Sequence, residues 1–140
     1  MGSFAVVALA VLFLLEYSVF ADHAFAAKAW CLIFASAVPR AWSTFAVLSF
    51  RPLPGSSYER MFSGGVPRGC QTAAGAELLL LVVCPVVIFG RAGISALAGL
   101  VGSVLTTAWI RRDLGGMSGD VSGAGITVGE LCALAALSLL

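Results

Sequence analysis

The chain has 140 residues, of which 60% are hydrophobic and 11% are charged, and its formal net charge is +1. Soluble domains carry about 25% charged residues, so the composition argues against a soluble protein and predicts an integral membrane protein. The nearly balanced charge gives no support for nucleic-acid binding.

Several apolar runs approach or exceed the length that crosses a bilayer as a helix, which is about 20 residues. In chain order, we expect five spans at residues 4–20, 29–50, 73–89, 92–110 and 121–140. Each should be helical because a backbone in lipid must satisfy its own hydrogen bonds. The sequence therefore predicts an all-α polytopic bundle that forms a single membrane-embedded domain over residues 1–140.

The second span contains Pro39 and Arg40 near its centre. Proline removes one helical hydrogen bond, so we expect the span to be kinked or interrupted there. An arginine at this depth is costly in lipid, which predicts that Arg40 faces a polar cavity or an anionic partner. The alternative is a shorter span in which Arg40 lies nearer an interface and extends toward it.

The basic residues predict an orientation. Arg51, Arg60, Arg68, Arg111 and Arg112 fall in the loops that follow spans two and four, whereas Lys28 and Arg91 fall on the other side. The positive-inside rule then places the arginine-rich loops in the cytoplasm. Because both loops lie on one side, they can line one cytoplasmic site.

The loop at residues 111–120 combines two arginines, three glycines and two aspartates. Glycine permits sharp turns and close backbone approach, carboxylates bind hard cations such as Mg²⁺, and arginine binds phosphate oxygens. This combination predicts a phosphate-handling site at the membrane edge. The alternative is an ordinary connecting loop, with glycine for the turn and arginine for orientation.

The last span carries Glu130 within an apolar helix, ten residues after Asp120. An ionisable residue inside the membrane suggests a functional site, although a protonated carboxyl can also serve as a hydrogen bond between helices. Small residues at 122–125 and at 129 would let a neighbouring helix or a bulky ligand approach closely.

A wider resemblance rests on the stretch Gly115-Gly116-Met117-Ser118-Gly119-Asp120, which is followed by Gly123 and Glu130. It is similar to the C-terminal signature of the cobalamin synthase family, the adenosylcobinamide-GDP ribazoletransferases. Weaker similarities involve Arg40, Phe62, Arg112 and the segment Gly2-Ser3-Phe4-Ala5-Val6. The chain departs from the family pattern at Ser118, where threonine is usual, at Thr127, where many members have a carboxylate, and in the loop at 51–60.

The resemblance implies a Mg²⁺-dependent transferase of the bacterial inner membrane in cobalamin (vitamin B12) biosynthesis. Such an enzyme joins α-ribazole, or its 5′-phosphate, to adenosylcobinamide-GDP and releases GMP. It further implies that Asp120 and Glu130 are metal ligands and that Asp120, Glu130 and Arg40 are catalytic. Phosphate binding would fall to residues of this loop: Arg112, Gly115, Gly116, Ser118 and Gly119.

The resemblance covers only the C-terminal half of the family, whose N-terminal half carries a His-x-Asp-Gly and Asp-rich motif. We therefore expect either a fragment, a chain that a second subunit or a second copy completes, or a non-catalytic subunit. A small transporter lined by Arg40 and Glu130 is a weaker alternative, because the five spans show neither an inverted repeat nor a ladder of charges.

Overall fold

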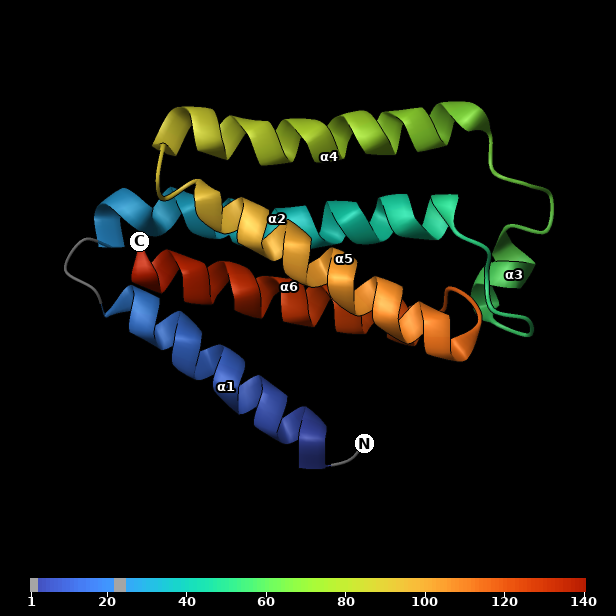
Figure 1. Cartoon of the computed structure of the whole chain (residues 1–140), viewed down its shortest axis with the longest axis horizontal. Coiled ribbons are helices and arrows are strands. Elements are labelled where there is room, and N and C mark those ends of the chain that lie inside the picture. Colours follow the sequence, from blue (N-terminus) through green and yellow to red (C-terminus); the bar gives the residue numbers. More distant parts are fainter. Residues whose placement is uncertain (1–2, 22–24) are drawn as a thin grey trace.

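The structure is a computed structural model that describes residues 3–21 and 25–140. Within these ranges the chain forms six helices, α1 (Ser3–Phe20), α2 (Phe25–Ser49), α3 (Ser57–Met61), α4 (Arg68–Phe89), α5 (Ile94–Leu114) and α6 (Gly119–Leu139) (Figure 1). No β-strand is present in the described ranges. The expected all-α bundle is confirmed, while the resemblance noted at Gly2 lies outside the described residues.

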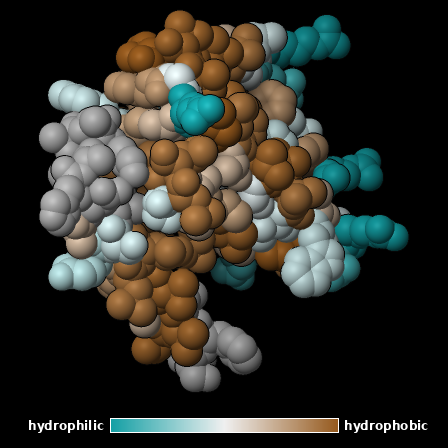
Figure 2. All heavy atoms as spheres, turned by 60° about the vertical axis from the view of Figure 1, so that its left-hand side comes forward, coloured by the Kyte–Doolittle hydropathy of each residue, from teal (hydrophilic) through white to brown (hydrophobic). Residues whose placement is uncertain are grey.

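Among the residues that the structure describes, four helices are long and apolar enough to cross a membrane, namely α2 from Ala29 onward, α4, α5 and α6. The first predicted span coincides with α1. Apolar side chains cover most of the surface visible in Figure 2, and hydrophilic side chains project mainly at one edge. On α4, for example, Leu79 and Val87 are 65% and 76% exposed. Such a surface is suited to lipid, and the chain is a multi-pass membrane protein.

The polar ends of the helices differ from the sequence-based expectation in two respects. Helix α5 continues to Leu114, so Arg111 and Arg112 lie in its last turn and not in the following loop. Cations are favourable at this end because the helix dipole is negative there. The short helix α3 between α2 and α4 was also missed; it is only five residues long and has no buried side chain that would give an apolar pattern.

Helices α5 and α6 form the most extensive contact in the bundle. Glycines make this approach possible: a Cβ added to Gly125 would lie 2.5 Å from Thr107 Oγ1, and one added to Gly129 would lie 2.0 Å from Ser103 Oγ. The expectation that the small residues of the last span admit a neighbouring helix is confirmed. Close contact between small residues is a usual basis of helix association in membranes.

The predicted interruption at Pro39 is wrong, because α2 is one helix from Phe25 to Ser49. Pro39 is buried, and its ring lies against α5 and α6, where Cβ atoms built on Gly99 and Gly129 would be 3.8 and 3.0 Å from Pro39 Cγ. A membrane helix tolerates proline because neighbouring helices support the segment that lacks the hydrogen bond. The proline therefore marks the point where three helices meet.

Helix α1 packs against the pair formed by α2 and α6. Leu12 and Leu15 contact a buried cluster of Ala35, Ala133 and Leu134. Toward its N-terminal end, α1 diverges from the rest of the bundle (Figure 1). There Val6 and Val7 are exposed. Helix α1 thus covers the α2–α6 pair over only part of its length.

Candidate functional site

Two loops that are far apart in the sequence join at one end of the bundle. The Leu53 N–H donates to Met117 O over 2.8 Å, and the Met117 N–H donates to Arg51 O over 2.8 Å. These bonds form a parallel bridge between Pro52 and Met117, which we call the clasp (residues 51–53 and 116–117). The prediction that the loops after spans two and four lie on the same side is confirmed.

Gly115 and Gly116 let the chain turn after α5 and approach the other loop closely. Gly115 ends α5 in the left-handed conformation, with φ of 83°, and its N–H donates to Arg111 O over 2.9 Å. A Cβ on Gly116 would lie 2.6 Å from Leu53 Cα. Only glycine fits these two positions without strain or displacement. The predicted close backbone approach is thus an approach to another loop of the same chain.

An open recess of about 510 Å³ lies on one side of the clasp, lined by Leu53, Pro54, Gly55, Ser56, Ser57, Leu114, Ser118, Gly119 and Asp120. We call it the acidic recess. Asp120 is exposed in the first turn of α6. Ser118 is the N-cap of this helix, and its Oγ accepts from the Val121 N–H over 3.4 Å. The sequence brings a carboxylate, three hydroxyl groups and a helix N-terminus to one water-facing position.

The loop that forms the opposite wall is fixed by its own polar contacts. Ser56 caps α3 by accepting from the Glu59 N–H over 3.3 Å, and Glu59 Oε2 accepts from the Gly55 N–H over 2.5 Å. These two contacts tie the turn at residues 55–56 to the first turn of α3. Ser56 and Ser57 were not predicted as site residues, since a serine pair in a turn carries no signal until the clasp brings it opposite Asp120.

A second recess, of about 370 Å³, lies beside Gly115 and Gly116 and is also lined by Arg51, Ala108, Arg111 and Arg112. We call it the basic recess. The Arg111 guanidinium lies 4.0 Å from the centroid of the Phe50 ring, a cation–π contact that holds this side chain at the recess. Arg112 was expected to bind phosphate. Arg111 belongs to the loop at 111–120, whose arginines were expected to bind phosphate, whereas Arg51 had been used only for orientation because it is far from that loop in the sequence.

The structure does not bring Asp120 and Glu130 together. They are ten residues apart on α6, which corresponds to about 15 Å along the axis. One ion therefore cannot be held by both carboxylates in this arrangement. The expected pair of metal ligands becomes a single carboxylate at the membrane edge and a separate one near the middle of the span.

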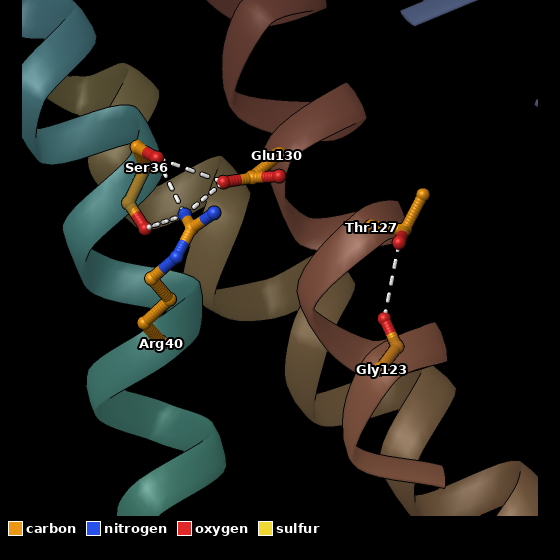
Figure 3. Close-up of polar contacts among 5 residues, drawn as sticks. All are labelled: Ser36, Arg40, Gly123, Thr127 and Glu130. Atoms are coloured by element: carbon orange, nitrogen blue, oxygen red, sulfur yellow. Dashed lines mark hydrogen bonds and ion pairs between the residues drawn. The ribbon is translucent and has the colours of Figure 1, made fainter. Parts of the chain in front are cut away.

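Glu130 forms an ion pair with Arg40 of α2 (Figure 3). Ser36 donates to Glu130 Oε1 over 2.8 Å, and Arg40 Nη1 also donates to Ser36 O over 2.8 Å. The expectation that Arg40 faces an anionic partner is confirmed. Arg40 lies nine residues before Ser49, about 14 Å along the helix, so the pair lies near the middle of the candidate membrane span of α2.

The oxygen atoms that line the acidic recess are of the kind that Mg²⁺ prefers as ligands. Protein sites usually hold this ion through one or two carboxylates, and water and substrate phosphates complete its six oxygen ligands. Asp120 and the hydroxyl groups around it fit such a substrate-dependent site. Within the described residues, no three side chains of His, Cys, Asp or Glu form a cluster that would hold a metal by itself.

Comparison with known proteins gives one family. The model of the family described as cobalamin-5-phosphate synthase matches residues 1–138. No curated protein and no solved structure matches the chain. The match covers nearly the whole sequence and confirms the resemblance that the glycine- and aspartate-containing loop suggested.

Proposed function

The chain belongs to the cobalamin-5-phosphate synthase family, and from this premise we propose that it joins α-ribazole, or its 5′-phosphate, to adenosylcobinamide-GDP and releases GMP. Membership of the family gives the chain a role in cobalamin biosynthesis. The observation that supports the specific reaction is the clasp, which holds the acidic and basic recesses on adjacent sides of one glycine loop.

The proposed reaction is a substitution at phosphorus. A ribazole hydroxyl attacks the phosphorus atom nearest the cobinamide, the phosphoanhydride bond breaks, and its electron pair leaves with GMP. The hydroxyl proton passes to a base or to water. Such reactions depend mainly on positioning and on neutralising the charge that develops on the phosphate oxygens.

The acidic recess is our candidate for the diphosphate. A carboxylate beside a diphosphate is repulsive unless a cation lies between them, so the exposed Asp120 favours a divalent ion bound together with the substrate. Mg²⁺ would supply charge neutralisation of the phosphate oxygens and of the leaving GMP. Ser118 and the N-terminus of α6 are placed to hold a phosphate oxygen, since the first N–H groups of a helix have no partner within it.

Arg112, together with Arg51 and Arg111 of the basic recess, would hold the phosphate groups that face the other side of the loop. Arg40 and Glu130 have a different task in this proposal. Because they bind each other about 15 Å deeper in the membrane, we assign them to anchoring α2 against α6 and not to the reacting phosphorus atom.

The bacterial inner membrane and a cytoplasmic position of the clasp belong to the same proposal. Their support is the excess of arginine at this end of the bundle: Arg51, Arg60, Arg68, Arg111 and Arg112. A second subunit or a second copy as a partner also remains a proposal. It is supported by the divergence of α1 from the rest of the bundle, so that α1 covers the α2–α6 pair over only part of its length (Figure 1).

The proposal is tested in membranes that contain the chain, alone and with its native partners, supplied with adenosylcobinamide-GDP, Mg²⁺ and either form of α-ribazole. We expect GMP and the cobalamin product in equal amounts, and no GMP when the ribazole is omitted. GMP released at the same rate without ribazole would indicate a diphosphate hydrolase and would contradict the transfer reaction.

A further inference from the structure

The ion pair of Arg40 and Glu130 belongs to a longer row of polar residues. Helix α2 contributes Ser36, Arg40 and Thr44, and helix α6 contributes Gly123, Thr127 and Glu130. We call these six residues the polar stripe. On each helix they are three or four residues apart, so they share one face, and the α6 part leads toward Asp120 and the acidic recess.

The stripe lies away from the tightly packed side of α6. Gly125 and Gly129, which contact α5, are separated from Gly123 and Thr127 by two residues in each case. Two residues correspond to about 200° around a helix, so the stripe is on the opposite side. Within this row Arg40, Thr44 and Gly123 are exposed.

The threonines of the stripe are compatible with lipid. Thr44 Oγ1 donates to Arg40 O and Thr127 Oγ1 donates to Gly123 O, each over 3.1 Å. A hydroxyl group that binds its own helix in this way is satisfied without any external partner. The threonines alone therefore do not decide what covers this face.

Arg40 indicates what covers this face of the bundle. Its hydrogen bonds to described residues all use Nη1, whereas a guanidinium carries five N–H donors on three nitrogen atoms. Its side chain is 56% exposed near the middle of the bilayer. Hydrocarbon offers no acceptor, so the outward N–H groups require water or an anion. The exposed face of α4, with Leu79, Val83 and Val87, makes no such demand.

We propose that the polar stripe is a water-lined surface that extends from Asp120 to the centre of the membrane, and that the outward edge of Arg40 binds a phosphate group. The fork of donors in arginine matches phosphate oxygens. The ligand is therefore a phosphate-bearing amphiphile or phosphate ester, whose anionic group reaches about 15 Å below the membrane edge. The inference does not depend on the transferase reaction, because both of its parts are measurable without turnover.

The test uses single cysteines in a chain whose own Cys31, Cys70, Cys84 and Cys132 are replaced by alanine. Thr127→Cys reports on the stripe, and Ala76→Cys on α4 is the matched control. Both positions lie eight residues after the start of their helices, and Ala76 is exposed. The chain is placed in phosphatidylcholine vesicles and treated with an anionic and with a cationic methanethiosulfonate.

We expect Thr127→Cys to react at least about tenfold faster than Ala76→Cys, because these reagents attack the thiolate, which forms in water and not in hydrocarbon. The anionic reagent should react faster than the cationic one, and Arg40→Gln should remove this preference. If Thr127→Cys disturbs folding, Thr44→Cys gives the same readout from α2.

Two arms then distinguish the sources of phosphate. Protection of Thr127→Cys by added GDP, lost in Arg40→Gln, would indicate a soluble phosphate ester. Protection by phosphatidylglycerol in the vesicle, lost in the same variant, would indicate a lipid headgroup. Labelling no faster than at Ala76→Cys would overturn the water-lined surface, and so would disulfide-linked dimers of Thr127→Cys, which would show a second copy on the stripe. Protection that persists in Arg40→Gln would overturn the phosphate site.

Discussion

The membrane edge and the membrane centre of this bundle treat charge in opposite ways. At the edge, Asp120 and Arg112 are exposed beside open recesses, and within the described residues Asp120 forms no ion pair. At the centre, Arg40 and Glu130 neutralise each other. Water can solvate Asp120 and Arg112 at the edge, and a ligand can displace that water. Charges at the depth of Arg40 and Glu130 need a partner within the folded chain.

The structure therefore separates the glycine loop from Glu130, which the sequence had placed in one candidate site. The glycine loop and Glu130 belong to one signature, yet they lie at different depths. The edge offers free charges for chemistry on phosphate, and the centre offers a paired charge that positions two helices. Four substitutions, at Asp120, Gly129, Gly116 and Glu130, test whether the two regions differ in this way.

Replacing Asp120 with Asn should lower the rate of GMP release by about 100-fold or more, because the diphosphate loses the ligand that brings a cation to it. The fold should be unchanged, since Asp120 is exposed. Asp113→Asn is the control: this carboxylate is exposed on α5 and does not line the acidic recess. Equal losses in the two variants would contradict the assignment.

Replacing Gly129 with Ala should lower the free energy of unfolding by about 1–3 kcal/mol, because the added Cβ overpacks the centre of the bundle. It would meet Ser103 Oγ at 2.0 Å and the Gly99 carbonyl oxygen at 2.9 Å. Gly123→Ala, with no neighbouring atom within 4 Å of the added Cβ, is the matched control. Unfolding in mixed micelles measures both, and the prediction fails if the two variants are equally stable.

Replacing Gly116 with Ala should reduce the rate about tenfold and leave the helix content unchanged. The Cβ would collide with the backbone of Leu53, so the clasp must open and the two recesses lose their alignment. Gly64→Ala is the control, because Gly64 lies in open space. Activity and circular dichroism check the result, and full activity in Gly116→Ala would show that the clasp is dispensable.

Replacing Glu130 with Gln should lower the free energy of unfolding by only about 1 kcal/mol or less, since water at the polar stripe can solvate the Arg40 that remains. The same unfolding measurement decides this. A loss of about 3 kcal/mol or more would mean that Arg40 is left in hydrocarbon, as expected for a charge at the centre of a lipid-facing helix.

The sequence predicted the helical spans well because hydrophobicity over about 20 residues is a strong and local signal. The ends of the spans were less accurate. Arg111 and Arg112 look like loop residues, yet α5 continues through them until Gly115 ends it with a positive φ. Pro39 was expected to interrupt its helix because proline removes a helical hydrogen bond. The expectation failed because Pro39 packs against Gly99 and Gly129, which are far away in the chain.

Only the parts of the site that have a local signal in the sequence were predicted. The loop around Asp120 carries its own chemical signature, and the arginine count placed the two loops on one side. The clasp, by contrast, depends on backbone hydrogen bonds between residues 51–53 and 117, which leave no trace in side-chain pattern. The partners Ser56 and Arg51 are therefore visible only in the folded chain, as is the pairing of Glu130 with Arg40.

In the proposed reaction, Asp120 brings a divalent cation to the diphosphate at the membrane edge. The decisive measurement is the rate of GMP release over a range of Mg²⁺ concentrations in the wild-type chain and in Asp120→Asn. We expect a saturable rise for the wild type and a curve for the variant that is displaced to much higher Mg²⁺ or stays flat. Superimposed curves would contradict it.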